Sequence, residues 1–489
     1  MSTVDDKTPL PGGTTTPDAA GPPTMTSRQR LILFLLLGAQ FTLAVDFSIL
    51  NVAVPEIGAK VGFSLENLQW IATSFALTAA GFTLLFGRIA DLFGRRKLFM
   101  AGIALLGAAS LLGGLANSPT VLIIARVAQG LGTAMVTPAG LSLLTTSFPE
   151  GPLRDRALGL NGAMLSAGFT FGAVLGGVLT SLVSWRWAFL INVPVAVLIL
   201  VVAPILLKES RTQHAKLDIP GAVTVSVGLI SLVFGISQAG TKGWGSATTL
   251  GALALGVVLL VSFWFIELKS KEPLASVRVL GRRSVSFGNL GGAATFIGFT
   301  AMIFLLTLYL QEVLGYSPLT VGLCFGVLGI GAFLGGVTAP RWIGVFGSSR
   351  ALLVISLIVQ AVAVGILYFA GDNRGWLIPV LVLGFISSYG HVCAIVGYLV
   401  TATSGLPDDQ QGLATGITTM TQQVSITIGI PIMSAIATSR IYSLGGATVE
   451  NKLSGVTVAI LSNGLIVLAV ALIVGFFLRK GKTAAPVAG

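Results

Sequence analysis

The chain has 489 residues, of which 54% are hydrophobic and only 10% are charged. Soluble domains carry about 25% charged residues, so this composition excludes an ordinary soluble protein. The net charge of +11 does not indicate nucleic-acid binding, because most Lys and Arg residues fall in alternate connections between apolar segments, as the positive-inside rule describes. We therefore expect a lipid bilayer around the chain and no nucleic-acid partner.

Apolar segments of about 20 residues recur along the chain, and each is long enough to cross ~30 Å of hydrocarbon. They predict an all-α polytopic membrane protein with fourteen spans in the cell (cytoplasmic) membrane. The even number of spans, together with the distribution of positive charge, predicts that both termini are cytoplasmic. The expected spans are residues 31–54, 68–88, 98–117, 119–147, 157–183, 187–207, 219–239, 248–267, 285–311, 319–340, 350–370, 376–404, 411–438 and 455–478.

A short internal repeat predicts that the chain consists of two halves. FGRRK at residues 93–97 and FGSSR at residues 346–350 both follow a span on the same side of the membrane, and parallel repeats of this kind occur in transporters. The spans left over after two sets of six form a pair between the halves. The expected divisions are a disordered tail 1–27, a bundle 28–210, two additional helices 211–268, a basic connection 269–284, a bundle 285–479 and a tail 480–489.

Two charged residues fall within predicted spans and not at their last or first residue; a charge there costs at least ~2.5–3.5 kcal/mol and is a functional candidate. Asp46 lies in the second half of the first span. A carboxyl group removed from water binds a proton more readily, so Asp46 could exchange a proton for a cationic ligand. The competing interpretation is a capping aspartate, since Asn51 and Pro55 suggest that the span ends nearby.

Arg126 lies near the start of the fourth predicted span, on one helical face with Gly130, Thr133 and Thr137. That face could turn towards a polar interior. Alternatively, Arg126 could extend to the external headgroups.

Five glycines in the fifth predicted span would let a second helix approach closely. They are Gly159, Gly168, Gly172, Gly176 and Gly177.

The residues of typical enzyme and metal sites are sparse. Cys324, Cys393 and His391 lie in predicted spans and His214 lies in a loop, with no carboxylate cluster beside them. We expect no metal site, no cofactor and no enzymatic activity.

These segments together resemble the major facilitator superfamily. GRIADLFGRRK at residues 87–97 looks like the loop between the second and third spans of that family, and Arg126-x-x-Gln129-Gly130 resembles its second motif. The glycines of the fifth span resemble the motif typical of antiporters, except that Ala173 stands where that motif usually has proline. The segments 46–55 and 185–194 are similar to the fourteen-span drug:proton antiporters in particular.

The resemblance implies two six-helix bundles plus two additional helices, and an alternating-access exporter of amphipathic or lipophilic drugs or antibiotics, driven by the proton motive force. It implies a small-molecule substrate, protons as the coupling ion and a monomeric protein. Asp46 and Arg126 would couple transport to protons, and a charge lock at the cytoplasmic edge would involve Gly87, Asp91, Gly94, Arg95 and Arg96. Expected cavity-lining residues are Gln129, Phe171, Tyr389 and Gln422.

Three other functions remain open from the sequence. One is an exporter dedicated to a single metabolite, lipid or siderophore. The others are a proton-coupled uptake symporter and a membrane sensor that transports nothing.

Overall fold

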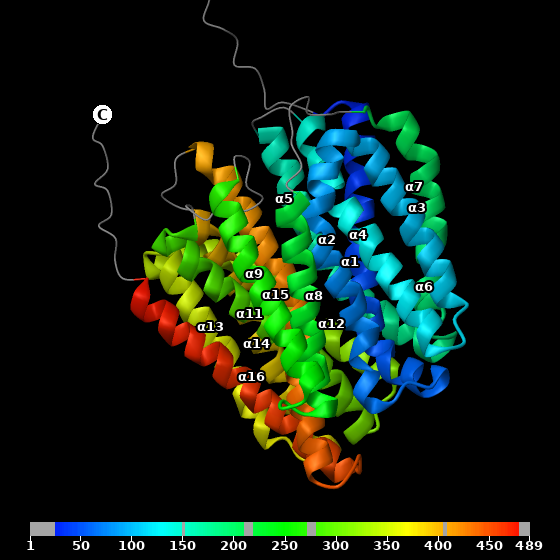
Figure 1. Cartoon of the computed structure of the whole chain (residues 1–489), viewed down its shortest axis with the longest axis vertical. Coiled ribbons are helices and arrows are strands. Elements are labelled where there is room, and N and C mark those ends of the chain that lie inside the picture. Colours follow the sequence, from blue (N-terminus) through cyan, green and yellow to red (C-terminus); the bar gives the residue numbers. More distant parts are fainter. Residues whose placement is uncertain (1–24, 149–151, 210–218, 271–279, 404–407, 479–489) are drawn as a thin grey trace, which may run out of the picture.

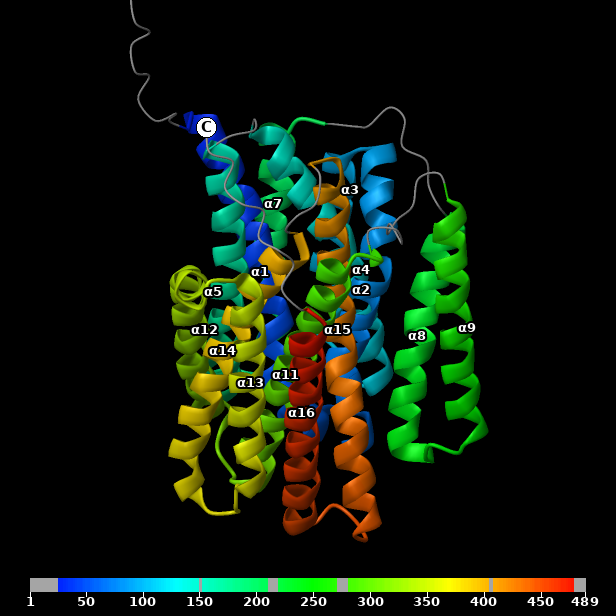
Figure 2. The ribbon, with the colours of Figure 1, turned by 90° about the vertical axis from the view of Figure 1, so that its left-hand side faces the viewer.

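The computed structural model describes residues 25–148, 152–209, 219–270, 280–403 and 408–478, and their regular structure is helical, with no strand among them. The helices run roughly parallel to one another and form one elongated bundle (Figure 1). Helix α1 begins at one end of this bundle, and α16 (Val449–Phe477) runs towards that end (Figure 2). We call the side on which α1 begins the terminal side.

The first half of the chain forms a set of helices that pack on one another. Within it, α1 packs on α5, α2 and α3 pack on α4, and α3 packs on α7. These helices are α1 (Ser27–Val61), α2 (Gln69–Phe93), α3 (Arg95–Gly114), α4 (Pro119–Ser147), α5 (Pro152–Leu182), α6 (Trp187–Leu190) and α7 (Asn192–Leu206).

Helix α1 extends further than its sequence suggests. It begins after a capping box, in which the Thr26 and Gln29 side chains each accept a hydrogen bond from the other residue's backbone N–H group, and it ends at Gly62 in the left-handed conformation. Pro55 lies inside the helix, which continues to Val61. The interpretation of Asp46 as a capping residue is therefore wrong, because Asp46 lies well within a continuous helix.

The C-terminal part of the chain repeats this arrangement with a second set. Helix α11 packs on α14, α15 and α16, while α13 packs on α14 and α16 and α12 packs on α14. The helices are α11 (Arg283–Leu308), the π-helical turn η2 (Tyr309–Val313), α12 (Pro318–Phe346), α13 (Ser349–Ile366), α14 (Leu377–Thr403), α15 (Asp408–Ser443) and α16 (Val449–Phe477). Short 3₁₀ turns lie in the connections of the two sets: η1 (Leu65–Asn67) in the first, and η3 (Leu367–Phe369) and η4 (Arg374–Trp376) in the second.

Helices α8 (Ile219–Lys242) and α9 (Ala247–Lys269) form a pair at the edge of the bundle (Figure 2). Helix α8 packs on α2 and α15, and the Ser226 hydroxyl donates a hydrogen bond to the Gly81 carbonyl oxygen of α2. Only 17% of the most apolar stretch of α9 is buried. The pair is therefore attached through α8, and α9 presents its apolar side chains outwards.

Among the described residues, 12 helical segments are long and apolar enough to cross a membrane. Helices α2 and α5, which contain side chains outside the described set, lie where the other two spans are predicted and pack on α4 and α1 respectively. The chain is thus a multi-pass membrane protein with an all-α fold. The predicted tails and most of the connection 269–284 lie outside the described residues, so those divisions stay predictions.

The two helical sets make several contacts at the end of the bundle opposite the terminal side. Gly177 of α5 lies against α12, where an added Cβ would stand 2.6 Å from the Pro318 carbonyl oxygen. The Leu319 amide donates to the Ser181 hydroxyl at 2.9 Å, and Gln311 Nε2 in the π-helical turn donates to the Val52 carbonyl oxygen at 2.7 Å. These contacts hold α5 and α1 to the second set near the ends of both helices.

Candidate functional site

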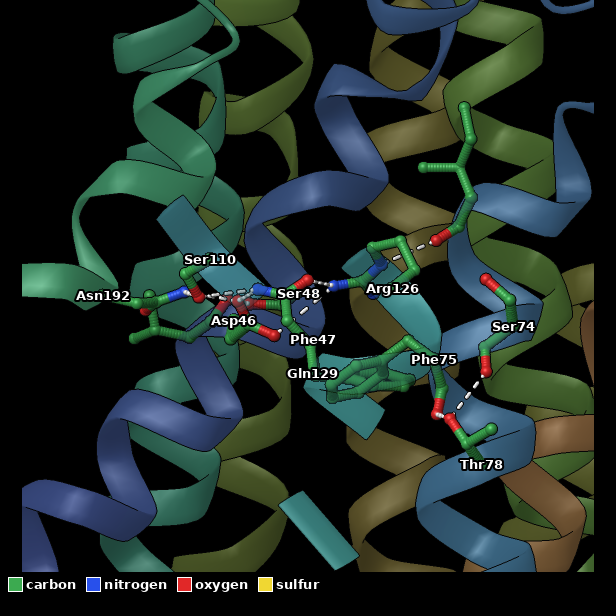
Figure 3. A network of polar contacts seen from close by, with 12 residues as sticks. Asp46, Phe47, Ser48, Ser74, Phe75, Thr78, Ser110, Arg126, Gln129 and Asn192 are labelled. Atoms are coloured by element: carbon green, nitrogen blue, oxygen red, sulfur yellow. Dashed lines mark hydrogen bonds and ion pairs between the residues drawn. The ribbon is translucent and has the colours of Figure 1, made fainter. Parts of the chain in front are cut away.

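A network of polar side chains surrounds Asp46 in the interior of the first helical set (Figure 3). Arg126 Nη1 lies 3.4 Å from Asp46 Oδ2, and Gln129 Nε2 donates to Asp46 Oδ1 at 3.0 Å. Asn192 Nδ2 donates to the same oxygen. The Asp46 carboxylate thus accepts hydrogen bonds from helices α4 and α7.

The Arg126 guanidinium is held by more than its ion pair. Its Nε donates to the Ile71 carbonyl oxygen at 2.8 Å, and its Nη1 donates to Gln129 Oε1 at 2.8 Å. The Phe75 ring lies beneath it, with 4.3 Å from Cζ to the ring centroid. Contacts of this kind favour a planar cation over a lysine ammonium.

Sequence spacing and close helix packing bring these groups together. Arg126 and Gln129 are three residues apart on α4, so both side chains leave the same face of the helix. Gly130 lets that face approach α2, since an added Cβ would stand 2.4 Å from the Phe75 carbonyl oxygen. From α3, the Ser110 hydroxyl accepts from Gln129 Nε2 at 2.8 Å, so the polar side chains of the network come from four helices of the first set, α1, α3, α4 and α7.

The network is sealed from the surroundings. The Asp46 side chain is 0% exposed and that of Arg126 is 1% exposed. Charges removed from water are tolerated when they are paired and hydrogen-bonded, and these contacts meet that requirement. The interpretation in which Arg126 extends to the headgroups is therefore wrong.

A cavity of about 420 Å³ lies between the two helical sets. Phe47 and Phe75 line it from the first set, and Phe299 and His391 line it from the second. None of its described lining residues is Asp, Glu, Lys or Arg. Asp46 and Arg126 are absent from the lining, and Phe47 and Phe75 connect the charged network with the cavity wall.

The cavity lies across the middle of the helices and extends towards the terminal side. Its lining includes Gln40 and Asn161, in the first parts of α1 and α5, and Leu141 near the end of α4. The second set contributes Ile395 near the end of α14 and Gln422 in the first half of α15. The two sets also touch beside the cavity, where the Thr427 hydroxyl donates to the Ala76 carbonyl oxygen at 3.0 Å, and they meet beyond it on the opposite side.

The structure corrects most of the predicted lining. Gln422 lines the cavity, whereas Gln129, Phe171 and Tyr389 do not. Gln129 is 0% exposed because its amide is used within the charged network. Phe171 is 59% exposed, with its ring edge-on to Phe41, and the Tyr389 hydroxyl pairs with Thr338 at 2.7 Å on another face of the second set.

The glycines of the fifth predicted span fit against two different helices. Added Cβ atoms on Gly168, Gly172 and Gly176 would stand 2.7, 2.7 and 2.1 Å from carbonyl oxygens of α1 that lie four residues apart. Gly177 instead faces α12, while the surroundings of Gly159 lie outside the described residues. Helix α5 continues without a break through Ala173, which lines the cavity. The motif therefore brings α5 close to both helical sets.

The loop between α2 and α3 makes a contact that its sequence does not reveal. Gly94 has φ +116°, and the backbone N–H groups of Arg96 and Lys97 donate to the two carboxylate oxygens of Glu209 at 3.1 and 3.3 Å. A carboxylate at the first turn of α3 is favoured by the helix dipole. Arg96 Nη1 also donates to the Leu207 carbonyl oxygen at 3.2 Å.

The other residues of the predicted charge lock are placed as follows. An added Cβ on Gly87 would stand 3.6 Å from Pro138 of α4, and Arg95 is half-buried. The side chain of Asp91 lies outside the described residues, so the charge lock stays a prediction.

Sequence reasoning missed Ser110, Asn192 and Glu209 as functional candidates. Ser110 and Asn192 are polar residues inside apolar spans, and this signal was visible in the sequence. Glu209 follows a span among other charged residues, so nothing local distinguishes it from a solvated loop residue.

Comparisons with known proteins agree with this architecture. The family model of the Major Facilitator Superfamily matches residues 36–430 and, in an overlapping match, residues 289–488. The puromycin resistance protein of Streptomyces alboniger is 33% identical over 438 residues, which cover 88% of this chain and 87% of that protein. The cephamycin export protein of Amycolatopsis lactamdurans is 34% identical over 418 residues, covering 85% of this chain and 86% of that protein.

A solved structure supports the fold alone. The human organic anion transporter TETRAN superposes with a TM-score of 0.59 at 14% identity, covering 92% of this chain and 100% of that one. With the family model matching most of the chain and two relatives above 30% identity over most of their lengths, the chain belongs to the major facilitator superfamily.

Proposed function

We propose that the protein exports amphipathic drugs or antibiotics across the cytoplasmic membrane in exchange for protons. The observation that carries the proposal is a sealed, titratable ion pair directly behind an apolar cavity without charged lining among the described residues. Such a cavity accepts lipophilic molecules of varied shape. Names of relatives that refer to puromycin resistance and cephamycin export support the same direction of transport.

The terminal side is cytoplasmic in this proposal. The excess of Lys and Arg in the connections on that side supports the assignment. The cavity then faces the cytoplasm, and the contacts of Gly177, Ser181 and Gln311 close the external side. Substrate would bind from the cytoplasm in this state and leave when a monomeric transporter rocks its two helical sets the other way.

Proton binding at Asp46 would supply the coupling. A protonated Asp46 no longer balances the Arg126 charge, so the guanidinium must find new partners or move. Phe75 contacts that guanidinium and also lines the cavity. Phe47, which follows Asp46 in the chain, lines the same wall of the cavity. Their displacement would change the cavity when the proton binds.

The driving force is of a useful size. One proton that moves down a membrane potential of 100 mV releases about 2.3 kcal/mol. That free energy supports a ~50-fold gradient of a neutral substrate exchanged one for one. No cofactor is needed in this scheme.

The test is transport of a cationic dye into energised inside-out vesicles that contain Asp46→Asn. We expect dye binding to persist and proton-driven accumulation to fall at least tenfold, because the amide cannot carry a proton. The matched control is Asp372→Asn, which alters an exposed loop carboxylate and is expected to transport at the wild-type rate. Wild-type accumulation by Asp46→Asn would refute the coupling role.

A susceptibility panel tests the breadth of substrates. Cells that express the protein are expected to resist several chemically unrelated amphipathic compounds. Resistance to one compound alone would instead favour an exporter dedicated to a single metabolite.

A further inference from the structure

A second polar cluster lies in the other wall of the cavity, where α11, α13 and α14 meet. His391 Nδ1 lies 2.9 Å from the Thr295 hydroxyl oxygen, and that hydroxyl lies 2.7 Å from Gln360 Oε1. Gln360 Nε2 donates to the Thr295 carbonyl oxygen at 3.1 Å. The Gln360 amide is therefore oriented with its nitrogen towards the backbone of α11 and its oxygen towards the hydroxyl.

This orientation determines which way the hydrogen bonds run. A hydroxyl has one hydrogen, and the oxygen of an amide can only accept. The Thr295 hydrogen must therefore point to Gln360 Oε1, so its oxygen accepts from His391. The donor is then His391 Nδ1–H, and in the neutral imidazole the other nitrogen, Nε2, carries an unshared electron pair.

His391 Nε2 is available to a ligand. His391 lines the cavity and is 5% exposed overall. Its Nε2 has no hydrogen-bond partner among the described residues. It is also not one of the fully buried polar atoms without a partner there, so part of its surface is accessible. The free acceptor therefore faces the cavity.

Aromatic rings hold this acceptor in a fixed direction. The Phe299 ring stacks on the imidazole with centroids 4.0 Å apart and an interplanar angle of 3°, while Phe296 meets it edge-on at 5.4 Å. Because Asp, Glu, Lys and Arg are absent from the described lining, His391 is the one side chain there that combines a fixed acceptor with an aromatic surface. A ligand with an apolar body and an N–H or O–H group fits this surface.

We infer that His391 is a specificity-determining residue that accepts a hydrogen bond from the ligand, so that the cavity prefers amphipathic molecules carrying an amine, amide or hydroxyl donor over molecules of similar size without one. The inference rests on the proposed function and concerns ligand choice, whereas Asp46 concerns proton coupling.

The test compares two cationic probes on purified full-length protein in detergent. Ethidium carries aromatic amino groups, whereas tetraphenylphosphonium has neither N–H nor O–H. His391→Phe keeps an aromatic ring against Phe299 and removes the acceptor. We expect this variant to bind ethidium about tenfold more weakly, the scale of one hydrogen bond to a cationic ligand, and tetraphenylphosphonium within twofold of wild type.

A second variant guards against a folding defect in the first. Thr295→Val removes the hydroxyl that holds Nδ1–H, so ethidium affinity is expected to fall several-fold while tetraphenylphosphonium affinity stays within twofold. The matched control is Thr307→Val on the same helix, because Thr307 bonds to its own helix at Ile303 and lies away from the cavity lining. It should change neither affinity.

The outcomes separate the two proposals. Equal loss for both probes in His391→Phe and Thr295→Val, or unchanged ethidium affinity in both, overturns the inference. If the wild-type protein binds tetraphenylphosphonium but not ethidium, the inference is overturned and the proposed function still stands. If the wild type binds neither probe, the proposed function fails and the inference with it.

Discussion

The two helical sets place polar groups on corresponding helices, but the polar groups differ in charge. The first set buries a charged network and the second buries a neutral one, each built on four corresponding helices. In the first set these groups are Asp46 on α1, Ser110 on α3, Arg126 and Gln129 on α4, and Asn192 on α7. In the second set they are Thr295 on α11, Gln360 on α13, His391 on α14 and Asn463 on α16.

The difference separates two tasks. A buried ion pair is stable only while both charges are present, so the proposed binding of a proton at Asp46 would disturb the first set strongly. The cluster around His391 has no charge to lose and opens on the cavity, so it can bind a ligand without such a disturbance. We therefore propose that coupling resides in the first set and ligand recognition in the second.

The loops that carry the internal repeat show the same contrast. Gly94 and Gly347 both adopt positive φ, at +116° and +68°. The helix after Gly94 is capped by the Glu209 carboxylate, whereas Ser348 caps the helix after Gly347, accepting from the Ala351 amide at 3.1 Å. One set again uses charge where the other uses a hydroxyl.

The largest expected effect comes from breaking the ion pair. Arg126→Ala leaves Asp46 buried without its counter-charge and should lower the free energy of unfolding by about 3–5 kcal/mol. The matched change in the neutral cluster, Gln360→Leu, should cost about 1–3 kcal/mol. Denaturant titration in mixed micelles measures both, and a larger cost for Gln360→Leu would break the comparison.

An intermediate effect is expected from the two asparagines that occupy corresponding helices of the two sets. Asn192 donates to a carboxylate and Asn463 donates to the Gly298 carbonyl oxygen at 2.8 Å. Hydrogen bonds to charged groups are worth about 1.5–3 kcal/mol against about 0.5–1.5 kcal/mol for neutral ones. Asn192→Ala should therefore destabilise the protein more than Asn463→Ala does. Asn192→Ala should also reduce proton-driven dye transport, whereas Asn463→Ala should leave coupling intact. Similar transport by the two variants would count against the division of tasks between the two sets.

The smallest effect is expected at the helix caps. Glu209→Gln removes the charge at the start of α3 and should cost about 0.3–1 kcal/mol, with a smaller loss at high salt. Ser348→Ala should cost about 1 kcal/mol with no dependence on salt. Thermal unfolding midpoints at low and high ionic strength distinguish the two, and an equal response to salt would show that charge has no special role at the first loop.

Much of the fold followed from the sequence. The apolar segments predicted the spans because helices that cross a bilayer must be long and apolar. The family motifs predicted the architecture that the family model matches. Asp46 and Arg126 were identified as candidates because a charge within such a segment is costly, and the glycines of α5 indicated close packing without saying against which helix.

The sequence by itself determined which residues enter the membrane and which of them are charged, since both depend on the composition of single segments. Only the tertiary structure decided that Asp46 and Arg126 pair behind Phe47 and Phe75 and away from the cavity lining. It also decided that Asn192 and Glu209 reach across 146 and more than 110 positions to their partners, and that His391 lines the cavity with its Nδ1 beside the Thr295 hydroxyl. These contacts depend on how separate helices rotate and pack, and no local pattern specifies that rotation.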